Sequence, residues 1–371
     1  MVKRKNIAFV LRTIGLEYDD RVRKEATALS KIAKVTIYVN FADNRKESGI
    51  TNYGIPYKSF TLKTREKLPS SKYLFIKAID FFLQVRPYLN NSDIVWSHEE
   101  YAFMFPLLLN KNKSVWDLHE IPFRFEKGLM KKVFQFIEYN SLFLIHANKF
   151  RIEYLKKQGV ISNLDKHFHI HNYPDGKFLN SDKVSAKFME FKKWVGSDKY
   201  VYLQGLTVKE RFPTNSIKSI LDITDYKIVV IGPFDKTSKD KLSEEFSIEL
   251  DTRVFFVGLE DQVVIPSYLK NAEFTVVLYD SKKPNNLYCE PNRLYQAISL
   301  NVPVIVGNNP PMKEVVMENN FGIVIEDDGN DLLKLNEAVS KMLDNKYFFD
   351  KNLKSKSKYF RWDDKHVLKI I

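Results

Sequence analysis

Two segments of the sequence carry side chains suited to binding anions, and a third carries an imidazole. Lys209 and Arg211 follow Gly205, and Arg293 comes later in the chain. Cationic side chains beside a glycine, whose backbone N–H groups can closely approach a ligand, suit phosphate oxygens. His119 stands in the string Trp-Asp-Leu-His-Glu, and an unperturbed imidazole with a pKa of about 6.5 can donate a hydrogen bond or a proton.

The residues around Arg293 extend the anion-binding pattern. Arg293 lies at the start of a predicted helix, so its guanidinium and the free N–H groups of the helix could act together on phosphate oxygens. Asn292 could hydrogen-bond a sugar or phosphate, but it is also an ordinary N-cap residue, and both interpretations stay open. Gln296 offers amide donors and an acceptor, and Glu290 offers a carboxylate.

Two further features carry less weight. Gly15, in the loop after the first predicted strand, would let the backbone approach a ligand closely, but the chain has no glycine-rich dinucleotide fingerprint and no Walker sequence. Dehydrogenase and ATPase functions are therefore disfavoured.

His167, His169 and His171 alternate along a predicted strand. Alternation puts any residues on one face, and no matching carboxylate cluster accompanies them, so we expect no metal there.

The length and composition of the chain set the frame for these residues. A chain of 371 residues predicts two domains, and 44% hydrophobic with 28% charged residues indicates a folded globular protein. The single cysteine, Cys289, excludes an internal disulfide and favours a cytoplasmic setting. The apolar runs at 7–11, 73–85 and 101–109 are too short for a secretion signal or a membrane span.

Positive charge is concentrated in the first half of the sequence. Residues 1–175 hold 29 basic and 18 acidic residues (29 − 18 = +11) of the total charge of +12. This imbalance predicts either contact with an anionic surface, such as a membrane with acidic lipids, or a solvated lysine-rich surface. Nucleic acid is not an expected partner, because no recognisable binding motif occurs.

Short strand-like runs alternate with helical patterns along the whole chain. The runs are 6–11, 35–39, 93–96, 113–116 and 143–147, then 200–203, 227–231, 253–257, 274–278, 302–306 and 322–325. This alternation predicts an α/β fold with two doubly wound, Rossmann-like domains, residues 1–175 and 176–355, facing across a cleft that binds the ligand. Residues 356–371 are expected to form a C-terminal helix that packs back across the hinge.

Four segments, in order, resemble GT-B glycosyltransferases of the family 4 (group 1) type, which move a sugar from a nucleoside diphosphate to an acceptor. The segments are 20–37, then 93–98 with 116–120, then 172–175, and finally 290–306 with 314–324. The last of these is the most specific and resembles the donor-binding helix and the strand after it. The resemblance implies a GT-B fold and a nucleotide-sugar donor.

The resemblance also implies a role for each candidate residue. Arg293, Lys209, Arg211 and Gly205 would face the diphosphate, and His119 would face the acceptor. The nucleoside or sugar would be held by Gln296 and Asn292, with Glu290 as a further candidate. The backbone at Gly15 would lie against the donor or the acceptor. The family has two glutamates eight positions apart around this helix, whereas this chain has Tyr288 and Gln296 there. Glu290 could substitute for the first one.

The sequence therefore predicts a glycosyltransferase that uses a nucleoside-diphosphate sugar, with a UDP-sugar expected first, and no bound metal. We expect a retaining reaction on a saccharide or lipid-linked acceptor in bacterial-type surface polysaccharide assembly, in the cytoplasm or on the inner face of the membrane. An inverting reaction would instead need a base such as Glu99 or Glu120. The alternatives are an inactive GT-B partner or glycan-binding subunit, and a nucleotide-sugar epimerase.

Overall fold

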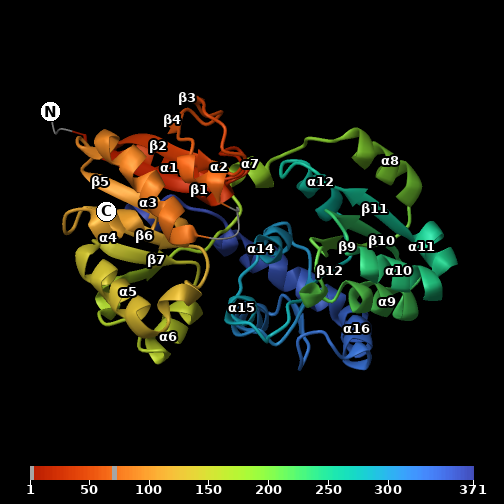
Figure 1. Ribbon diagram of the computed structural model, residues 1–371. Coiled ribbons are helices and arrows are strands. Elements are labelled where there is room, and N and C mark those ends of the chain that lie inside the picture. The colour runs from red at the N-terminus through yellow and green to blue at the C-terminus, as the bar shows by residue number, and fades with distance from the viewer. Residues whose placement is uncertain (1–3, 69–72) are drawn as a thin grey trace. The chain divides into compact units, whose positions relative to one another are not determined.

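The computed structural model describes residues 4–68 and 73–371. The chain divides into two compact units, which Figure 1 colours along the sequence. The first unit comprises Met1–His171 together with Asp363–Ile371, and the second comprises Asn172–Trp362. The chain therefore passes into the second unit after His171 and returns to the first after Trp362.

The first unit is built on an eight-stranded sheet of order β3-β4-β2-β1-β5-β6-β7-β8, in which only the β3–β4 pair is antiparallel. Its strands are β1 (Asn6–Thr13), β2 (Lys34–Phe41), β3 (Ser48–Ile50), β4 (Pro56–Ser59), β5 (Ile94–His98), β6 (Ser114–Leu118), β7 (Phe143–His146) and β8 (His167–His169). Every residue of β5 and β6 is buried, as expected for central parallel strands covered on both faces.

Helices connect these strands and cover the sheet. They are α1 (Asp20–Ser30), α2 (Lys63–Lys67), α3 (Leu74–Val85), α4 (Met104–Leu108), α5 (Gly128–Asn140), α6 (Lys149–Lys157) and α17 (Lys365–Leu368), with 3-10 turns η1 (Arg86–Leu89), η2 (Glu100–Ala102), η3 (Phe123–Phe125) and η4 (Leu164–Lys166). Helix α1 begins where its sequence predicts, because the Asp19 side chain accepts from the N–H of Val22 at 3.3 Å.

The second unit holds a six-stranded, all-parallel sheet of order β11-β10-β9-β12-β13-β14. Its strands are β9 (Tyr200–Gln204), β10 (Lys227–Ile231), β11 (Val254–Gly258), β12 (Thr275–Val277), β13 (Val304–Val306) and β14 (Gly322–Val324). Successive residues of these strands enter two separate apolar clusters: Tyr202 and Val229 belong to one, and Val201 and Ile228 to the other. The sheet is thus buried on both faces.

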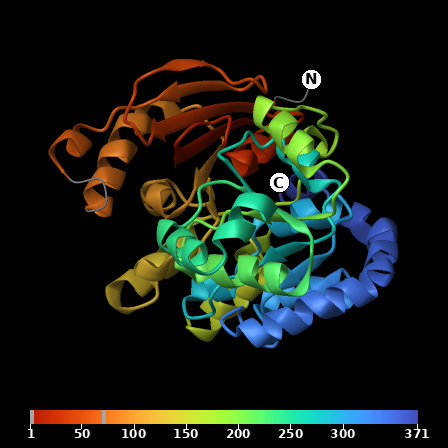
Figure 2. The same ribbon diagram turned by 90° about the vertical axis from the view of Figure 1, so that its right-hand side faces the viewer.

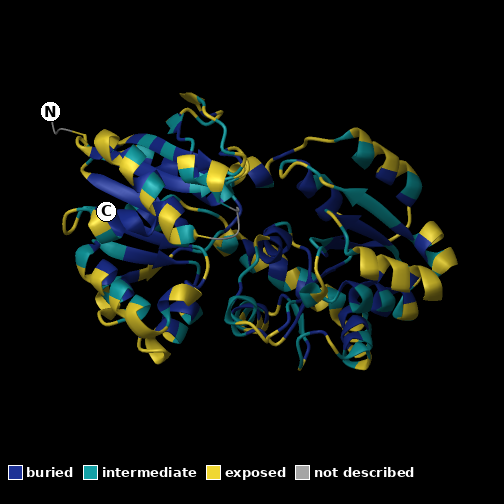
Figure 3. Ribbon diagram, viewed as in Figure 1, coloured by how far each residue is buried: buried dark blue, intermediate teal, exposed yellow. Residues whose placement is uncertain are grey.

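The helices of the second unit supply the other half of both clusters, and their outer faces are exposed (Figure 3). They are α7 (Gly176–Leu179), α8 (Ala186–Val195), α9 (Pro213–Ile223), α10 (Lys236–Glu245), α11 (Ser247–Arg253), α12 (Ile265–Leu269), α13 (Pro284–Leu287), α14 (Asn292–Ser299), α15 (Pro310–Asn319) and α16 (Leu332–Lys356), with turns η5 (Lys209–Arg211) and η6 (Ser357–Phe360).

The predicted fold class, two doubly wound α/β units, is confirmed. Strands β3 and β4 were not predicted, because they are only three and four residues long and carry no apolar run. The C-terminal segment also differs from expectation. Helix α16 runs unbroken for 25 residues to Lys356 (Figure 2), and residues 357–371 form η6 and the short α17 instead of one helix. Helix α17 contacts α1 within the first unit.

None of the helices in the described ranges, 4–68 and 73–371, combines the length and the apolar character needed to cross a membrane.

Candidate active site

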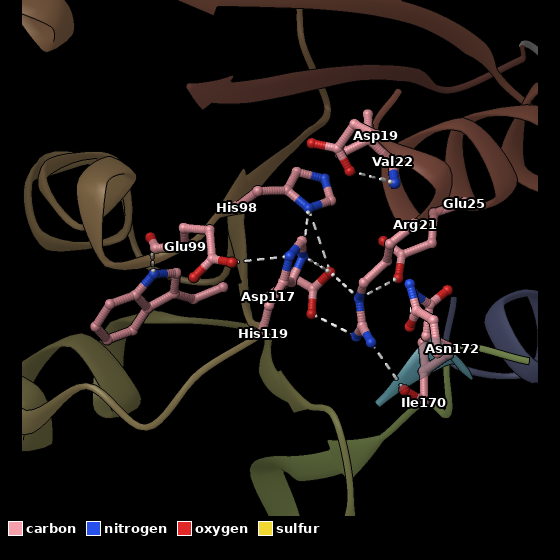
Figure 4. A network of polar contacts seen from close by, with 12 residues as sticks. Asp19, Arg21, Val22, Glu25, His98, Glu99, Asp117, His119, Ile170 and Asn172 are labelled. Atoms are coloured by element: carbon pink, nitrogen blue, oxygen red, sulfur yellow. Dashed lines mark hydrogen bonds and ion pairs between the residues drawn. The ribbon is translucent and has the colours of Figure 1, made fainter. Parts of the chain in front are cut away.

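The polar site of the first unit lies at the carboxyl ends of β5 and β6. His98 is the last residue of β5 and pairs in register with Asp117 of β6. His119 follows one residue after β6 ends. Because parallel strands end at the same edge of a sheet, the two imidazoles and the carboxylate meet there, next to Arg21 of α1 (Figure 4).

Asp117 is the centre of this network and is completely buried. Arg21 donates to it from Nε to Oδ2 at 2.9 Å and from Nη2 to Oδ1 at 2.6 Å, a bidentate ion pair between buried groups. The third guanidinium nitrogen, Nη1, donates to the carbonyl of Ile170 at 2.8 Å. Burial alone would raise the pKa of the Asp117 carboxyl, but Arg21 and His119 outweigh it and hold that pKa well below 3.8.

His119 lies between two carboxylates. Its Nδ1 is 2.9 Å from Oε1 of Glu99, and its Nε2 is 3.2 Å from Oδ2 of Asp117. Burial would lower the pKa of His119, but these two carboxylates outweigh it and raise that pKa well above 6.5. The expectation of an unperturbed imidazole is therefore wrong. The side chain of His119 is 22% exposed, so a ligand can reach the ring.

Two acidic residues beside this network are unusual. Glu99 has φ 65° and ψ 168°, a conformation almost reserved for glycine, and it is held there because its N–H donates to the Asp117 carbonyl at 2.8 Å. Trp116 Nε1 also donates to the Glu99 carbonyl at 3.0 Å. Such strain costs about 1–3 kcal/mol and is typical of functional sites. Glu25 is fully buried, and burial together with Asp117 raises its pKa to about 8 although Arg21 opposes the shift.

The site of the second unit forms where β9 ends. Gly205 has φ 69°, and a Cβ at this position would lie 2.9 Å from Nη1 of Arg211 and 3.7 Å from Nη1 of Arg293. Both guanidinium groups also lie over the ring of Tyr279, with Cζ at 5.2 Å and 4.9 Å from its centroid. The structure thus brings Gly205, Arg211 and Arg293 together, although 88 residues separate the first from the last.

The two arginines of this site donate to backbone carbonyls. Arg211 donates to Gly205, and Arg293 donates to Gln204 and, at 3.2 Å, to Leu278. Among the described residues, no carboxylate forms a salt bridge with either arginine. Arg293 is buried, and burial, with Arg211 close by, lowers its pKa despite the nearby Tyr279. Two adjacent cations without a carboxylate partner form an anion-binding arrangement.

Helix α14 positions the remaining donor-side candidates. Its N-cap is Pro291, so the interpretation of Asn292 as an N-cap is wrong. Asn292 is instead the first helical residue, is exposed, and accepts from Nδ2 of Asn172 at 2.8 Å. Gln296 is buried and donates from Nε2 to Oε1 of Gln262 at 3.1 Å. Within the part of the chain that the structure describes, its buried Oε1 has no hydrogen-bond partner and could accept one from a ligand.

Three other candidates lie outside these two networks. Lys209 is exposed in η5. Glu290 is half-buried and lies near Tyr295. Burial is the main cause that raises the pKa of Tyr295, and the carboxylate of Glu290 raises it further. Gly15 does not have a positive φ. Its lack of a side chain leaves room for the ring of Tyr18, because a Cβ at position 15 would lie only 3.0 Å from Cδ2 of Tyr18.

The alternating histidines do not form a metal cluster. His167 bonds His146 at 2.8 Å and Glu138 at 2.8 Å, and the rings of His169 and His171 contact each other. Within residues 4–68 and 73–371, the side chains of His98, Asp117 and His119 are the one group close enough together to hold a metal ion.

Sequence reasoning did not identify Arg21, Glu25 and His98 as site residues. Arg21 and its partner Asp117 are 96 positions apart, and Glu25 lies one helical turn after Arg21. The buried charges in α1 were the available indication. A helix that buries arginine and glutamate must supply partners for them, since buried charges are costly unless paired.

Comparison with known proteins gives one matching family and several similar structures. Residues 191–360 match the family described as glycosyl transferases group 1. Sucrose-phosphate synthase from Thermosynechococcus elongatus is similar in structure, with a TM-score of 0.76, 15% identity and coverage of 99% of this chain and 97% of that one. HepE of Anabaena in complex with UDP has a TM-score of 0.71, 13% identity and coverage of 98% and 97%.

A third structure, WaaG, a glycosyltransferase involved in lipopolysaccharide biosynthesis, has a TM-score of 0.64, 13% identity and coverage of 95% of both chains. No curated protein sequence matches the chain. The likeness to these structures shows a two-domain fold of the GT-B type. The residues that match the group 1 glycosyl transferases, 191–360, all lie in the second unit.

Proposed function

We propose that the protein transfers a sugar from a nucleoside-diphosphate sugar and that the diphosphate binds at Gly205, Arg211 and Arg293. The observation that carries this proposal is the pair of guanidinium groups that converge on Gly205 without a carboxylate partner among the described residues. A leaving diphosphate gains negative charge as the glycosidic bond breaks, and preorganised cations stabilise that charge. Exposed Lys209 is close enough in sequence to add a third cation.

A UDP-sugar is the donor we propose, because HepE, which is similar in structure, forms complexes with UDP and with UDP-glucose. In this chain, the buried and unpartnered Oε1 of Gln296 could accept a hydrogen bond from a ribose hydroxyl. Asn292, exposed at the first turn of α14, could donate to the sugar or phosphate. Glu290 would supply the carboxylate that the sequence lacks at position 288.

The first unit would bind the acceptor and, through His119, donate a hydrogen bond to the transferred sugar. The reaction we propose is retaining. Glu99, the nearest carboxylate to His119, is already bonded to it, and that contact holds the pKa of Glu99 below 4.5 although burial opposes the shift. A carboxylate in this state is a poor base, and a retaining transferase does not require one.

The acceptor we propose is a saccharide or a lipid-linked saccharide at an anionic membrane surface. Phe75, Ile76, Ile79 and Leu83 form an exposed apolar stripe along α3, opposite the face that packs into the first unit. Helix α2, which contacts α3, carries the basic residues Lys63, Arg65 and Lys67. An apolar helix face flanked by cations is typical of segments that lie in a membrane interface. A role in surface polysaccharide assembly on the cytoplasmic side would follow.

The proposal is tested by thermal stabilisation with UDP, GDP, dTDP, ADP and CMP, each with and without its sugar. A ligand at a hundredfold its dissociation constant adds about 2.7 kcal/mol to the free energy of unfolding. We expect one diphosphate to stand out and its shift to disappear in Arg293→Ala. Arg253→Ala is the matched control, since Arg253 also donates to backbone carbonyls of the second unit, those of Leu221, Thr224 and Tyr226.

If no nucleotide shifts the folded protein, the donor site is wrong, and an inactive partner or glycan-binding subunit becomes the function to pursue. A nucleotide shift accompanied by sugar rearrangement without any acceptor would favour the epimerase.

A further inference from the structure

Three cationic side chains of the first unit gather around the carboxyl ends of β1 and β2. Arg12 is the last residue but one of β1, and Arg65 belongs to α2, which contacts α3 (Figure 1). Both arginines are half-buried. Lys77 lies on α3 and is buried, with 4% of the residue exposed. These three residues form the Arg12 cluster.

Arg12 lies over the ring of Tyr101. The guanidinium carbon is 5.4 Å from the centre of this buried ring. The Tyr101 hydroxyl donates to Oδ1 of Asn40 at 3.4 Å, and Asn40 is the register partner of Arg12 on β2. Within residues 4–68 and 73–371, the guanidinium of Arg12 makes no hydrogen bond or ion pair. Its N–H donors are therefore available to a ligand.

Arg65 lies beside the end of the neighbouring strand. Its Nη1 donates to the carbonyl of Phe41, the last residue of β2, at 3.1 Å. Phe41 is in register with Thr13, the residue after Arg12. The two arginines thus lie at the ends of adjacent strands. Like Arg12, Arg65 forms no ion pair with a carboxylate of the described part of the chain.

Lys77 joins the cluster from α3. Phe81, one helical turn after Lys77, contacts the ring of Tyr101 with the centroids 5.8 Å apart, so this face of α3 packs beside the ring that carries Arg12. Burial lowers the pKa of the Lys77 ammonium, and the charges of Arg12 and Arg65 lower it further. The charges that shift this pKa are thus both positive.

Asp80 offsets part of the charge of the Arg12 cluster. Its Oδ2 accepts from the backbone N–H of Thr64 at 2.9 Å and from the Thr64 hydroxyl at 2.8 Å, and its Oδ1 accepts from Gln84 at 2.8 Å. These hydrogen bonds join α2 to α3 and so hold Arg65 near Lys77. One carboxylate against three cations leaves a net charge of about +2 (3 − 1) in a partly buried setting, which attracts an anion.

We propose that Arg12, Arg65 and Lys77 bind a phosphate group of the acceptor. A phosphate monoester carries about two negative charges and three oxygen acceptors, which match this net charge and the fork of a guanidinium. Parallel strands β1 and β6 are two positions apart in the sheet, about 10 Å, so the cluster and His119 share one edge. This inference rests on the proposed function of the first unit, and it narrows the acceptor to a phosphorylated one.

Calorimetry with glucose 1-phosphate at constant ionic strength tests the proposal. The parent protein is the 371-residue chain carrying Arg293→Ala, which weakens the proposed diphosphate site of the second unit. We expect the parent to bind glucose 1-phosphate and not glucose. Adding Arg12→Met or Arg65→Met should weaken binding by about tenfold or more, because each change removes a charged hydrogen-bond donor.

Arg45→Met is the matched control. Arg45 also lies over an aromatic ring of the first unit, with its Cζ 3.6 Å from the centre of Phe41, but it pairs with Asp43 and Glu47. Its loss should change the affinity by less than about twofold, since its charge is already offset. Octyl phosphate identifies the source of the phosphate: tighter binding than glucose 1-phosphate supports a lipid-linked acceptor, and weaker binding supports a phosphorylated saccharide.

The proposal is overturned if the parent does not bind glucose 1-phosphate, a result that needs no variant of the cluster to fold. It is also overturned if Arg12→Met and Arg65→Met bind like the parent, or if Arg45→Met loses as much affinity as they do. Nucleotide binding is not measured in this experiment, so its failure leaves the proposed donor site standing. A failure of the nucleotide panel, in turn, leaves binding of a phosphate at the Arg12 cluster to be decided by calorimetry.

Discussion

The two polar sites of the protein treat buried charge in opposite ways. In the Asp117 network of the first unit, each charged group has an opposite partner: Arg21 pairs with Asp117, and His119 pairs with Glu99. In the second unit, Arg293 is buried and, among the described residues, bonds only backbone carbonyls. Charges that neutralise one another hold a site rigid, whereas an unneutralised cation costs stability that a bound anion can return. This difference supports the proposed binding of an anion by the second unit.

The largest expected effect comes from removing one partner of the buried Arg21–Asp117 ion pair in the first unit. Arg21→Met leaves the Asp117 carboxylate buried without its guanidinium partner, which should lower the free energy of unfolding by about 3–5 kcal/mol. Denaturant unfolding of the first unit, followed by the fluorescence of its buried Trp96 and Trp116, measures the loss.

Arg124→Met provides the control for that variant. Arg124 also pairs with a glutamate of the first unit, Glu100, at 2.7 Å, but it is half exposed. A surface pair of this kind contributes about 0–1 kcal/mol. Equal losses in Arg21→Met and Arg124→Met would mean that burial of the first pair has no energetic consequence, and the contrast between the two units would fail.

The next largest effect is on turnover and comes from the second unit. Arg293→Ala removes a cation from the proposed diphosphate site and should raise the activation barrier by about 2–4 kcal/mol, seen in kcat/KM. Its loss of folding stability should be smaller than that of Arg21→Met, because no buried carboxylate is left behind. Arg253→Ala should keep its activity. Normal turnover in Arg293→Ala would show that the diphosphate binds elsewhere.

The same contrast shows which parts of the structure could be predicted from sequence. The fold was predictable because both sheets consist mainly of apolar runs that periodicity reveals. Strands β3 and β4 were missed because they are only three and four residues long and carry no such run. Arg211 and Arg293 could be named because a loop after a strand and the start of a helix are local features. The partner of Arg21 could not be named, because a contact across 96 positions depends on strand order and register.

The pKa of His119 was missed for a related reason. Its sequence neighbours suggest an ordinary imidazole, and Asp117, two residues earlier, is visible in the sequence. Glu99 reaches His119 only because β5 and β6 are adjacent and because its own backbone adopts φ 65°. Titration depends on such three-dimensional neighbours, so residue types alone do not fix it.

A third prediction compares an exposed leucine of the first unit, Leu83, with one of the second unit, Leu259. Leu83→Glu places a charge in the exposed apolar stripe of α3 and should reduce co-sedimentation with anionic vesicles at low salt several-fold, since a charged side chain opposes interfacial burial. Leu259→Glu is the matched control in the second unit, where Leu259 is also exposed. If both variants sediment like the wild-type protein, the membrane surface is not the partner of α3.

The smallest expected effect concerns the second histidine network of the first unit, in which His167 bonds both His146 and Glu138. Glu138 accepts from His167 at 2.8 Å and from the backbone N–H groups of Ser162 and Asn163 at 3.0 Å. Burial raises the pKa of Glu138, but these hydrogen bonds outweigh it and lower that pKa below 4.5.

A carboxyl whose pKa is lowered by folding stabilises the folded state above its unfolded pKa, and this contribution is lost as the pH falls through the folded value. Glu138→Gln should therefore be less stable than the wild-type protein by about 1 kcal/mol at pH 7, with the difference shrinking below pH 4.5. Thermal unfolding at pH 7, 5 and 3.5 measures it. If the stability difference between the wild-type protein and Glu138→Gln stays constant over this pH range, the network does not stabilise the ionised form of Glu138.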